Sequence, residues 1–254
     1  MPEESMGSAQ VAPLKNVAAL AELIDRVANR PIGLPGLGVL YGPSGFGKSM
    51  AAIYCTNRFH AVTVQIKSVW TRKKLCEAIL AEMGIPKAST VSDMLDQISE
   101  QLAISDVPLI IDEADFLVQR KMIEIIRDIY EGSQAPVILI GEELLPQKLR
   151  EWERVHNRVL DWVPAEPADM SDVAHLTRLY ASGVEVTKEL QERLLRESHA
   201  SIRRICVNLT RIAELARREG LETVGLDQWG KRPFFTGAAP EVRRFGDASA
   251  RRAG

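Results

Sequence analysis

Apolar residues follow two alternating patterns along the first two thirds of the chain. Short apolar runs, typical of buried strands, alternate with segments whose apolar residues return every three or four positions, as on one helix face. The expected strands are residues 38–41, 61–66, 107–111, 136–140 and 159–163. The expected helices are residues 14–27, a helix from Lys48 onward, and residues 71–84, 90–104 and 122–129. This alternation favours crossover connections and a parallel sheet.

The pattern changes after Pro164-Ala-Glu-Pro167. We expect no strand beyond this point, whereas helical periodicity is present at 171–180, 186–197 and 201–218. The predicted organisation is a flexible N-terminus at 1–12, an α/β domain at 13–166, a small helical domain at 167–226 and a flexible basic tail at 227–254. The basic residues of the tail are Lys231, Arg232, Arg243, Arg244, Arg251 and Arg252.

Length and composition exclude several classes of protein. The chain has 254 residues, of which 46% are hydrophobic, so it can bury a sizeable core. Its 32 Lys and Arg against 34 Asp and Glu give a net charge of −2, which excludes a uniformly basic nucleic-acid binder but not a local basic patch. No apolar run approaches the roughly 18 residues that a membrane-spanning helix needs. Without an apolar secretory segment at the N-terminus, the chain is expected to be cytoplasmic.

Cysteine and histidine usage does not indicate a metal centre. Cys55, Cys76 and Cys206 are odd in number, far apart and set in apolar helical contexts. This pattern is typical of reduced core thiols rather than of a disulfide framework or a metal site. The four histidines are scattered along the chain and show no spacing typical of metal ligands.

The strongest chemical signal is Gly42-Pro-Ser-Gly-Phe-Gly-Lys-Ser49, which matches the phosphate-loop pattern G-x-x-x-x-G-K-[ST]. It follows an apolar strand and opens a helix, a context that argues against a chance glycine turn. Its N–H groups would surround a phosphate at a helix N-terminus. Lys48 would contact the β- and γ-phosphates, and Ser49 would bind Mg²⁺. The predicted nucleotide-binding residues are Gly42, Pro43, Ser44, Gly45, Phe46, Gly47, Lys48, Ser49 and Met50.

A second signal is the pair Asp112-Glu113, which directly follows the apolar residues 109–111. The C-terminal end of such a strand is where ligands bind in open α/β sheets. Asp112 suits the Mg²⁺ shell, and Glu113 can orient and deprotonate a water that attacks the γ-phosphate. The alternative is that Glu113 only caps the next helix. Two acids after a buried strand are costly without a cation, which argues against a simple cap. A small-metabolite kinase would not need a water-activating glutamate here, so we predict an ATPase.

The order of these motifs resembles that of the AAA+ ATPases, with a phosphate loop, an Asp-Glu strand, a sensor strand and a helical lid. Within that superfamily the chain resembles the transposition regulators of the phage Mu B, TnsC and TniB type. The likeness covers roughly residues 14–218 and is carried by the phosphate loop, 109–115, 129–133, 137–142 and 201–204. It implies an α/β P-loop fold, with a three-layer parallel-sheet body and a C-terminal helical lid, and ATP and Mg²⁺ as cofactors.

The resemblance also implies roles for arginines outside the two motifs. Arg203 would be a second sensor that reaches the γ-phosphate from the lid. Arg204 is the alternative contact, and the structural alternative is that Arg203 is only a solvated arginine on a helix. Arg154 or Arg158, just before the last strand, would be an arginine finger that acts in a neighbouring subunit. Gly141-Glu142 ends the strand where a polar sensor is usual. Glycine followed by glutamate departs from the usual Asn, Thr or Ser.

Basic residues gather in two short segments of this acidic chain. Lys67-Ser-Val-Trp-Thr-Arg-Lys-Lys74 joins a predicted strand to a helix that Thr71 would cap, and Arg120-Lys121 follows the Asp-Glu strand. Both segments are solvated faces in the simplest interpretation, and Trp70 is more typical of packing than of base stacking. The family resemblance favours contact with DNA phosphates. The predicted DNA-binding residues are Lys67, Thr71, Arg72, Lys73, Lys74, Arg120 and Lys121.

Together, these features and the resemblance predict an ATP-dependent regulator of phage-type DNA transposition in the cytoplasm of a bacterial host. It would bind double-stranded DNA without sequence preference, assemble on it as a ring or helical filament of identical subunits, and recruit a transposase. One alternative is a helicase loader or replication initiator built on the same ATPase core. Another is a structural DNA filament that ATP stabilises with negligible turnover. No membrane partner is expected.

Overall fold

The computed structural model describes residues 14–237, in which five parallel strands form one sheet in the order β2-β3-β4-β1-β5. The strands are β1 (Leu37–Tyr41), β2 (Val62–Gln65), β3 (Leu109–Asp112), β4 (Val137–Gly141) and β5 (Val159–Pro164). In the sheet register, Leu139 of β4 lies between Val39 of β1 and Ile111 of β3. All five predicted strands and their parallel arrangement are therefore confirmed.

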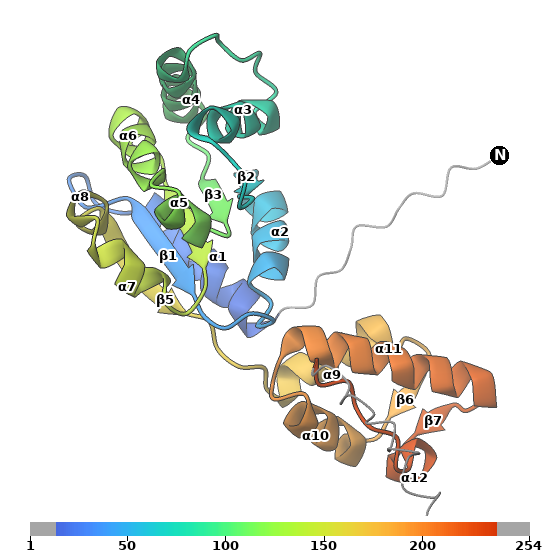
Figure 1. The fold of residues 1–254 in the computed structure, drawn as a ribbon. Coiled ribbons are helices and arrows are strands. Elements are labelled where there is room, and N and C mark those ends of the chain that lie inside the picture. The colour runs from blue at the N-terminus through green and yellow to red at the C-terminus, as the bar shows by residue number, and fades with distance from the viewer. Residues whose placement is uncertain (1–13, 238–254) are drawn as a thin grey trace, which may run out of the picture.

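Helices cover both faces of this sheet (Figure 1). One face carries α1 (Lys15–Ala28) and α2 (Lys48–Phe59). The other carries α3 (Arg72–Glu82), α4 (Val91–Ser105), α5 (Asp115–Gln119), α6 (Ile123–Ser133), α7 (Leu145–Arg150) and α8 (Glu153–His156). Successive strand residues point to opposite faces, so Leu40 and Ile140 join the first core cluster while Val39 and Leu139 join the second. The sheet is thus buried on both sides, which explains its continuous apolar runs.

The C-terminal region that follows β5 is mainly helical. Its helices are α9 (Met170–Tyr180), α10 (Lys188–Glu197), α11 (Ile202–Glu219) and α12 (Leu226–Trp229). The expectation of no strand here is wrong, because β6 (Glu185–Val186) and β7 (Thr223–Val224) form a parallel pair. Strands of two residues leave no apolar run in the sequence.

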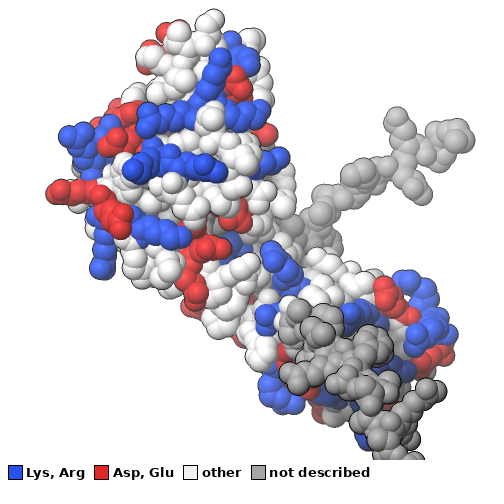
Figure 2. Space-filling view, viewed as in Figure 1, with Lys and Arg blue, Asp and Glu red and all other residues white. Residues whose placement is uncertain are grey.

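Charged side chains of both signs cover the sheet domain and the helical region alike (Figure 2). The predicted fold class, a three-layer parallel sheet with a C-terminal helical region, is confirmed.

Residues 227–237, where we expected the flexible tail to begin, pack against the C-terminal helices. Trp229 and Phe234 are buried, and their rings stack with centroids 4.9 Å apart. The fully buried Asn208 accepts a hydrogen bond from the Phe235 N–H (2.7 Å) and donates one to the Phe235 carbonyl (3.0 Å). Apolar burial therefore outweighs the basic character of this segment. Outside the described residues lie the predicted N-terminal segment at 1–12 and the tail from residue 238.

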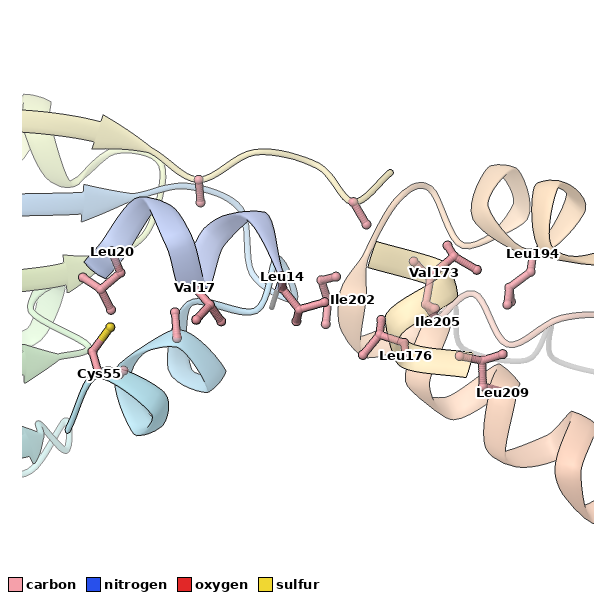
Figure 3. Packing of buried hydrophobic residues seen from close by; sticks show 14 of the residues in the cluster. Leu14, Val17, Leu20, Cys55, Val173, Leu176, Leu194, Ile202, Ile205 and Leu209 are labelled. Atoms are coloured by element: carbon pink, nitrogen blue, oxygen red, sulfur yellow. The ribbon is translucent and has the colours of Figure 1, made fainter. Parts of the chain in front are cut away.

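Packing and hydrogen bonds join the sheet domain to the helical region. Leu14, before α1, and Ile202, at the start of α11, point toward one another within a single apolar cluster (Figure 3). Asn16, only 5% exposed, donates to the carbonyls of Phe46 (2.7 Å) and Glu166 (2.8 Å). It also accepts from the Glu166 N–H at 2.9 Å. The start of α1 therefore connects the glycine-rich loop to the entry of the C-terminal region.

Cys55 and Cys76 are buried free thiols, and burial raises the pKa of Cys55 to about 12 and that of Cys76 to about 11. Such thiols stay protonated near neutral pH and react slowly.

Of the helices in residues 14–237, none has both the length and the apolar character needed to cross a bilayer.

Asn16→Ala should lower the free energy of unfolding by about 2 kcal/mol, because it removes three part-buried hydrogen bonds to backbone groups of Phe46 and Glu166. Urea denaturation followed by tryptophan fluorescence measures this loss. Asn29→Ala is the matched control, since the exposed Asn29 amide donates only to the Asp25 carbonyl of its own helix. The control should change stability by less than about 0.5 kcal/mol. Equal losses in the two variants would show that Asn16 has no special role.

Candidate functional site

The glycine-rich loop between β1 and α2 has a backbone that needs glycine at two positions. Gly45 and Gly47 have φ angles of +87° and +85°, in a region that residues with a Cβ rarely adopt. A Cβ on Gly45 would also lie 2.7 Å from the Ser201 hydroxyl oxygen. Position 45 therefore requires glycine both for its conformation and for the close approach of α11.

The N-terminus of α11 is hydrogen-bonded to this loop. The Gly45 carbonyl accepts from the Arg203 N–H at 3.1 Å and from the Ser201 hydroxyl at 3.3 Å. The two candidate sensor arginines, Arg203 and Arg204, lie in different places relative to the loop. Arg203 lines the cavity beside the loop, whereas Arg204 lies beside Gly237. Of the two predicted sensor residues, the structure brings only Arg203 to the loop.

Lys48, the first residue of α2, is held over the loop that precedes it. Its Nζ donates to the carbonyls of Gly42 (2.6 Å) and Pro43 (2.8 Å). Burial lowers the pKa of Lys48, against the opposing effect of the Asp112 and Glu113 carboxylates. A partly buried ammonium that is held beside the backbone of the phosphate loop is suited to pair with a phosphate.

Ser49 and Asp112, the two predicted Mg²⁺ ligands, lie within hydrogen-bond distance of each other. The Ser49 hydroxyl donates to Asp112 Oδ2 at 2.9 Å, and the Glu113 N–H donates to Oδ1 at 2.9 Å. Mg²⁺ prefers oxygen ligands and is usually held by one or two protein groups together with substrate phosphates and water. The hydroxyl and the buried carboxylate fit that donor set. Within residues 14–237, no cluster of three or more His, Cys, Asp or Glu forms another metal site.

Glu113 occupies a strained backbone position beside this pair. Its φ angle is +58°, in the left-handed region that costs a non-glycine residue about 1 kcal/mol. Burial raises the pKa of Glu113, and the neighbouring Asp112 and Glu142 carboxylates raise it further. A carboxylate with a raised pKa is a stronger base toward water, so the position suits a proton acceptor.

One cavity of about 310 Å³ collects these groups between the sheet domain and the C-terminal region. The predicted residues that line it are Ser44, Gly45, Gly47, Lys48, Ser49, Met50, Asp112, Glu113 and Arg203. The other residues that line it are Gly141, Glu142, Tyr180, Ile202, Cys206 and Val207. The lining combines charged groups with an apolar wall formed by residues such as Ile202 and Val207, which suits the phosphates and the base of a nucleotide.

Sequence reasoning missed most of the apolar wall and the hydrogen bonds that surround the loop. The wall residues on α11 share the spacing of ordinary core positions, so no pattern marks them. Asn16 lies in an amphipathic helix and gives no motif. Of the predicted loop residues, Gly42, Pro43 and Phe46 are absent from the cavity lining. The carbonyls of Gly42 and Pro43 accept hydrogen bonds from Lys48, and the Phe46 carbonyl accepts one from Asn16.

Arg154 and Arg158 lie away from this cavity, just before β5, whereas the cavity is at the C-terminal ends of the strands. Arg158 forms an ion pair with Glu131. Arg154 is exposed and makes no ion pair with any residue in the described part of the chain. Both arginines line a surface depression next to α6 and α8. Neither reaches the nucleotide cavity of its own chain.

The two predicted basic segments form a single surface. The Arg120 guanidinium donates to the Ser68 carbonyl at 2.6 Å, and Arg72 donates to the Lys121 carbonyl at 3.3 Å. These bonds join residues 52 and 49 positions apart in the chain. Lys and Arg side chains gather where α3 and α5 meet, above the sheet (Figure 2).

Within this surface the predicted helix cap is confirmed. The Lys74 N–H donates to the Thr71 hydroxyl oxygen at 3.3 Å, so Thr71 caps α3. Trp70 is half-buried and packs against the core, as expected. The exposed basic residues of the surface are Lys67, Arg72, Lys73, Lys74, Arg120 and Lys121. Their contact with DNA stays a prediction.

A phosphate loop and an acidic strand end on a parallel sheet define a P-loop nucleotide-binding protein. A family model for the AAA domain matches residues 32–149, which include both motifs and β4. The chain thus contains an AAA-type P-loop ATPase domain. A search of curated protein sequences gave no match.

Solved structures with similar folds include two DNA-replication proteins. The Orc1 protein of Aeropyrum pernix, in complex with DNA, has a TM-score of 0.61 at 18% identity and covers 84% of this chain and 62% of its own. Cdc6 of Pyrobaculum aerophilum has a TM-score of 0.57 at 13% identity and covers 88% and 65%. A Walker-type ATPase of Pyrococcus abyssi has a TM-score of 0.56 at 18% identity and covers 81% and 67%.

At these identities the likeness shows a shared fold alone. The chain spans less than two thirds of the Orc1 and Cdc6 chains. The coarse resemblance to AAA-type ATPases is confirmed, and the structural likeness is to the Orc1 and Cdc6 type. The finer likeness to transposition regulators stays a prediction.

Glu113→Gln should raise thermal stability at pH 7 in buffer without nucleotide or Mg²⁺. A raised pKa means that folding disfavours the ionised carboxylate, so stability falls as pH rises from the unfolded value of 4.5 through the folded pKa. The gain from glutamine should therefore disappear below about pH 4. Calorimetric melting across this range measures it, with the exposed Glu143→Gln as the control. A lower melting temperature for Glu113→Gln at pH 7 would contradict the prediction.

Proposed function

We propose that this protein is an ATP-hydrolysing regulator of DNA transposition that binds double-stranded DNA and assembles on it. The observation that supports this best is a nucleotide cavity built jointly by the phosphate loop and α11, in a domain that also carries a continuous basic surface. The AAA-type domain supports ATPase chemistry. That the protein assembles, binds DNA and recruits a transposase is part of this proposal.

Each group in the cavity has a chemical task in hydrolysis. The loop N–H groups and Lys48 bind the phosphates, and Ser49 with Asp112 would hold Mg²⁺. When bound, Mg²⁺ supplies positive charge that neutralises the phosphate oxygens. Glu113 accepts a proton from the water that attacks the γ-phosphate. Arg203 reaches the same phosphate from α11, so ATP and ADP make different contacts with the C-terminal region.

That difference makes the nucleotide a switch. A ligand shifts a conformational equilibrium only by its differential affinity for the two states. Arg203 comes from the C-terminal region and Lys48 from the sheet domain, so loss of the γ-phosphate weakens the link between the two parts. Such a change would alter how neighbouring subunits fit together and would reset an assembly on DNA.

The basic surface suits the DNA backbone. Its six exposed basic side chains and the capped N-terminus of α3 offer positive charge and N–H groups to phosphates. Contacts of this kind carry no base information, so binding should be independent of sequence and strongly dependent on salt.

Mixing two inactive variants tests the enzyme and its assembly together. Glu113→Gln should bind a fluorescent ATP analogue normally yet lose at least about 100-fold in turnover. Arg154→Ala should also lose turnover if its guanidinium completes a neighbour's site. An equimolar mixture should recover about a quarter of wild-type ATPase activity on DNA, because one interface in four pairs an intact cavity with an intact arginine.

The mixture also separates the alternatives. The control is Arg150→Ala, an exposed arginine on α7 outside the depression, which should leave turnover unchanged. An Arg154→Ala protein with normal turnover would exclude this finger, and Arg158→Ala would then be mixed in its place. Negligible turnover in the wild-type protein that Glu113→Gln leaves unchanged would favour the structural filament, in which hydrolysis plays no part.

DNA binding by the surface should depend on salt through Arg72 and Lys73. The double change to alanine should reduce the slope of log K against log salt by roughly two, because each side chain displaces about one counterion. Fluorescence anisotropy with random duplex DNA measures this slope. Arg217 and Arg218 on α11 provide the control pair, and an unchanged slope for Arg72 and Lys73 would remove this surface from the proposal.

A replication initiator or helicase loader is the second candidate. The observation that favours it is the structural likeness to Orc1 and Cdc6, the first of them bound to DNA. The transposition role instead rests on sequence likeness at residues 129–133, 137–142 and 201–204. Sequencing the DNA that the protein retains from a random pool separates a transposition regulator from an initiator. No enriched sequence supports target selection in transposition, and an enriched motif supports an initiator.

A further inference from the structure

Asp115 is a buried acidic residue to which the proposed hydrolysis assigns no task. It ends the motif Asp112-Glu-Ala-Asp115, begins α5 and is only 3% exposed. An ionised carboxylate is costly to bury unless it is paired and hydrogen-bonded. Its partners therefore indicate what the residue does.

Both carboxylate oxygens of Asp115 have partners on the segment that follows β4. Oδ1 accepts from Lys148 Nζ at 2.6 Å, and Oδ2 accepts from the main-chain N–H of Glu142 at 2.6 Å. Lys148 lies on α7 with its side chain 28% exposed, so it neutralises the carboxylate from the solvent side. The second bond fixes the peptide group through which the chain leaves β4.

Gly141 makes room for this contact. A Cβ at this position would lie 2.4 Å from Asp115 Oδ2 and 2.6 Å from a methyl carbon of Leu145. The φ angle of Gly141 is not in the left-handed region, so space rather than conformation requires glycine here. Three residues from β4, α5 and α7 thus meet at one point.

Glu142 is the residue that this contact orients. The peptide group held by Asp115 sets the direction in which the Glu142 side chain leaves the backbone. Glu142 lines the nucleotide cavity together with Glu113 and Lys48. A carboxylate there faces phosphates of the same charge, so its natural partner is a hydrogen-bond donor such as water.

We infer that Asp115 is a positioning residue that, with Lys148 and Gly141, holds Glu142 where its carboxylate orients the attacking water. The inference rests on the proposed ATPase function. One water proton passes to Glu113, the water oxygen bonds to the γ-phosphorus, and the bond from phosphorus to the β–γ bridging oxygen breaks. The electron pair of that bond leaves on ADP. Glu142 accepts a hydrogen bond from the second O–H of the water and takes no proton.

A double-mutant cycle between Asp115 and Glu142 tests the inference. Glu142→Ala and Asp115→Ala should each lower kcat at least about tenfold, because a misplaced reactant loses much of its rate. The Kd for fluorescent ADP should stay within about twofold in both, since neither change removes a loop contact. In the Glu142→Ala background, Asp115→Ala should cause no further loss.

Two further measurements separate positioning from a purely structural role. Asp115→Asn keeps an oxygen for the Glu142 N–H and should restore most of the kcat. Hydrogen exchange at the Glu142 amide, measured without nucleotide or metal, should become faster in Asp115→Ala and stay slow in Asp115→Asn. Glu143→Ala is the control, because Glu143 is exposed and does not line the cavity.

The outcomes are distinct from those that test the proposed function. A wild-type protein without ATPase activity contradicts the proposed function, while the exchange measurement still tests the Asp115 contact. Normal kcat in Asp115→Ala, or a full loss that persists in the Glu142→Ala background, overturns the inference. If Asp115→Ala does not fold, Gly141→Ala replaces it in the same cycle, because its Cβ displaces the Asp115 carboxylate.

Discussion

Hydrogen bonds to two carbonyls of the phosphate loop hold this structure together around its site. The Gly45 carbonyl is bound by the first residues of α11, and the Phe46 carbonyl is bound by Asn16 of α1. Asn16 also binds both backbone groups of Glu166, where the C-terminal region begins. The loop that would hold phosphate is therefore the point where both parts of the molecule meet. Any movement of one part relative to the other must act on it.

Charge in the site is arranged by burial and by backbone contacts rather than by net composition. Asp112 and Asp115 are buried, and each is satisfied by hydrogen bonds from neighbouring groups. Glu113 is aimed by a left-handed backbone, and Glu142 by the carboxylate of Asp115. Acidic groups thus lie close to the phosphate loop. Exposed basic groups gather on the surface formed by α3 and α5 (Figure 2). A net charge of −2 is compatible with both.

The larger elements could be predicted because their signals are local. The apolar runs of β1, β3 and β4 and the periodicity of α1, α6 and α11 come from burial on one or both sides of each element. Short elements escaped prediction, since β6 and β7 have two residues each and α5, α7 and α8 at most six. The start of the predicted tail was missed because Trp229 and Phe234 pack against helices that are distant in sequence.

The sequence by itself determined the chemistry of the nucleotide site, because the phosphate loop and Asp112-Glu113 are contiguous and their geometry follows from strand, turn and helix. Only the tertiary structure decided which groups join them. It brought Arg203 rather than Arg204 to the loop, merged two basic segments into one surface, and set Asp115 beneath Glu142. These contacts join residues 27 to 158 positions apart, and no local pattern records such a pairing. Their formation depends on how the sheet orders its strands and on where α11 meets the loop.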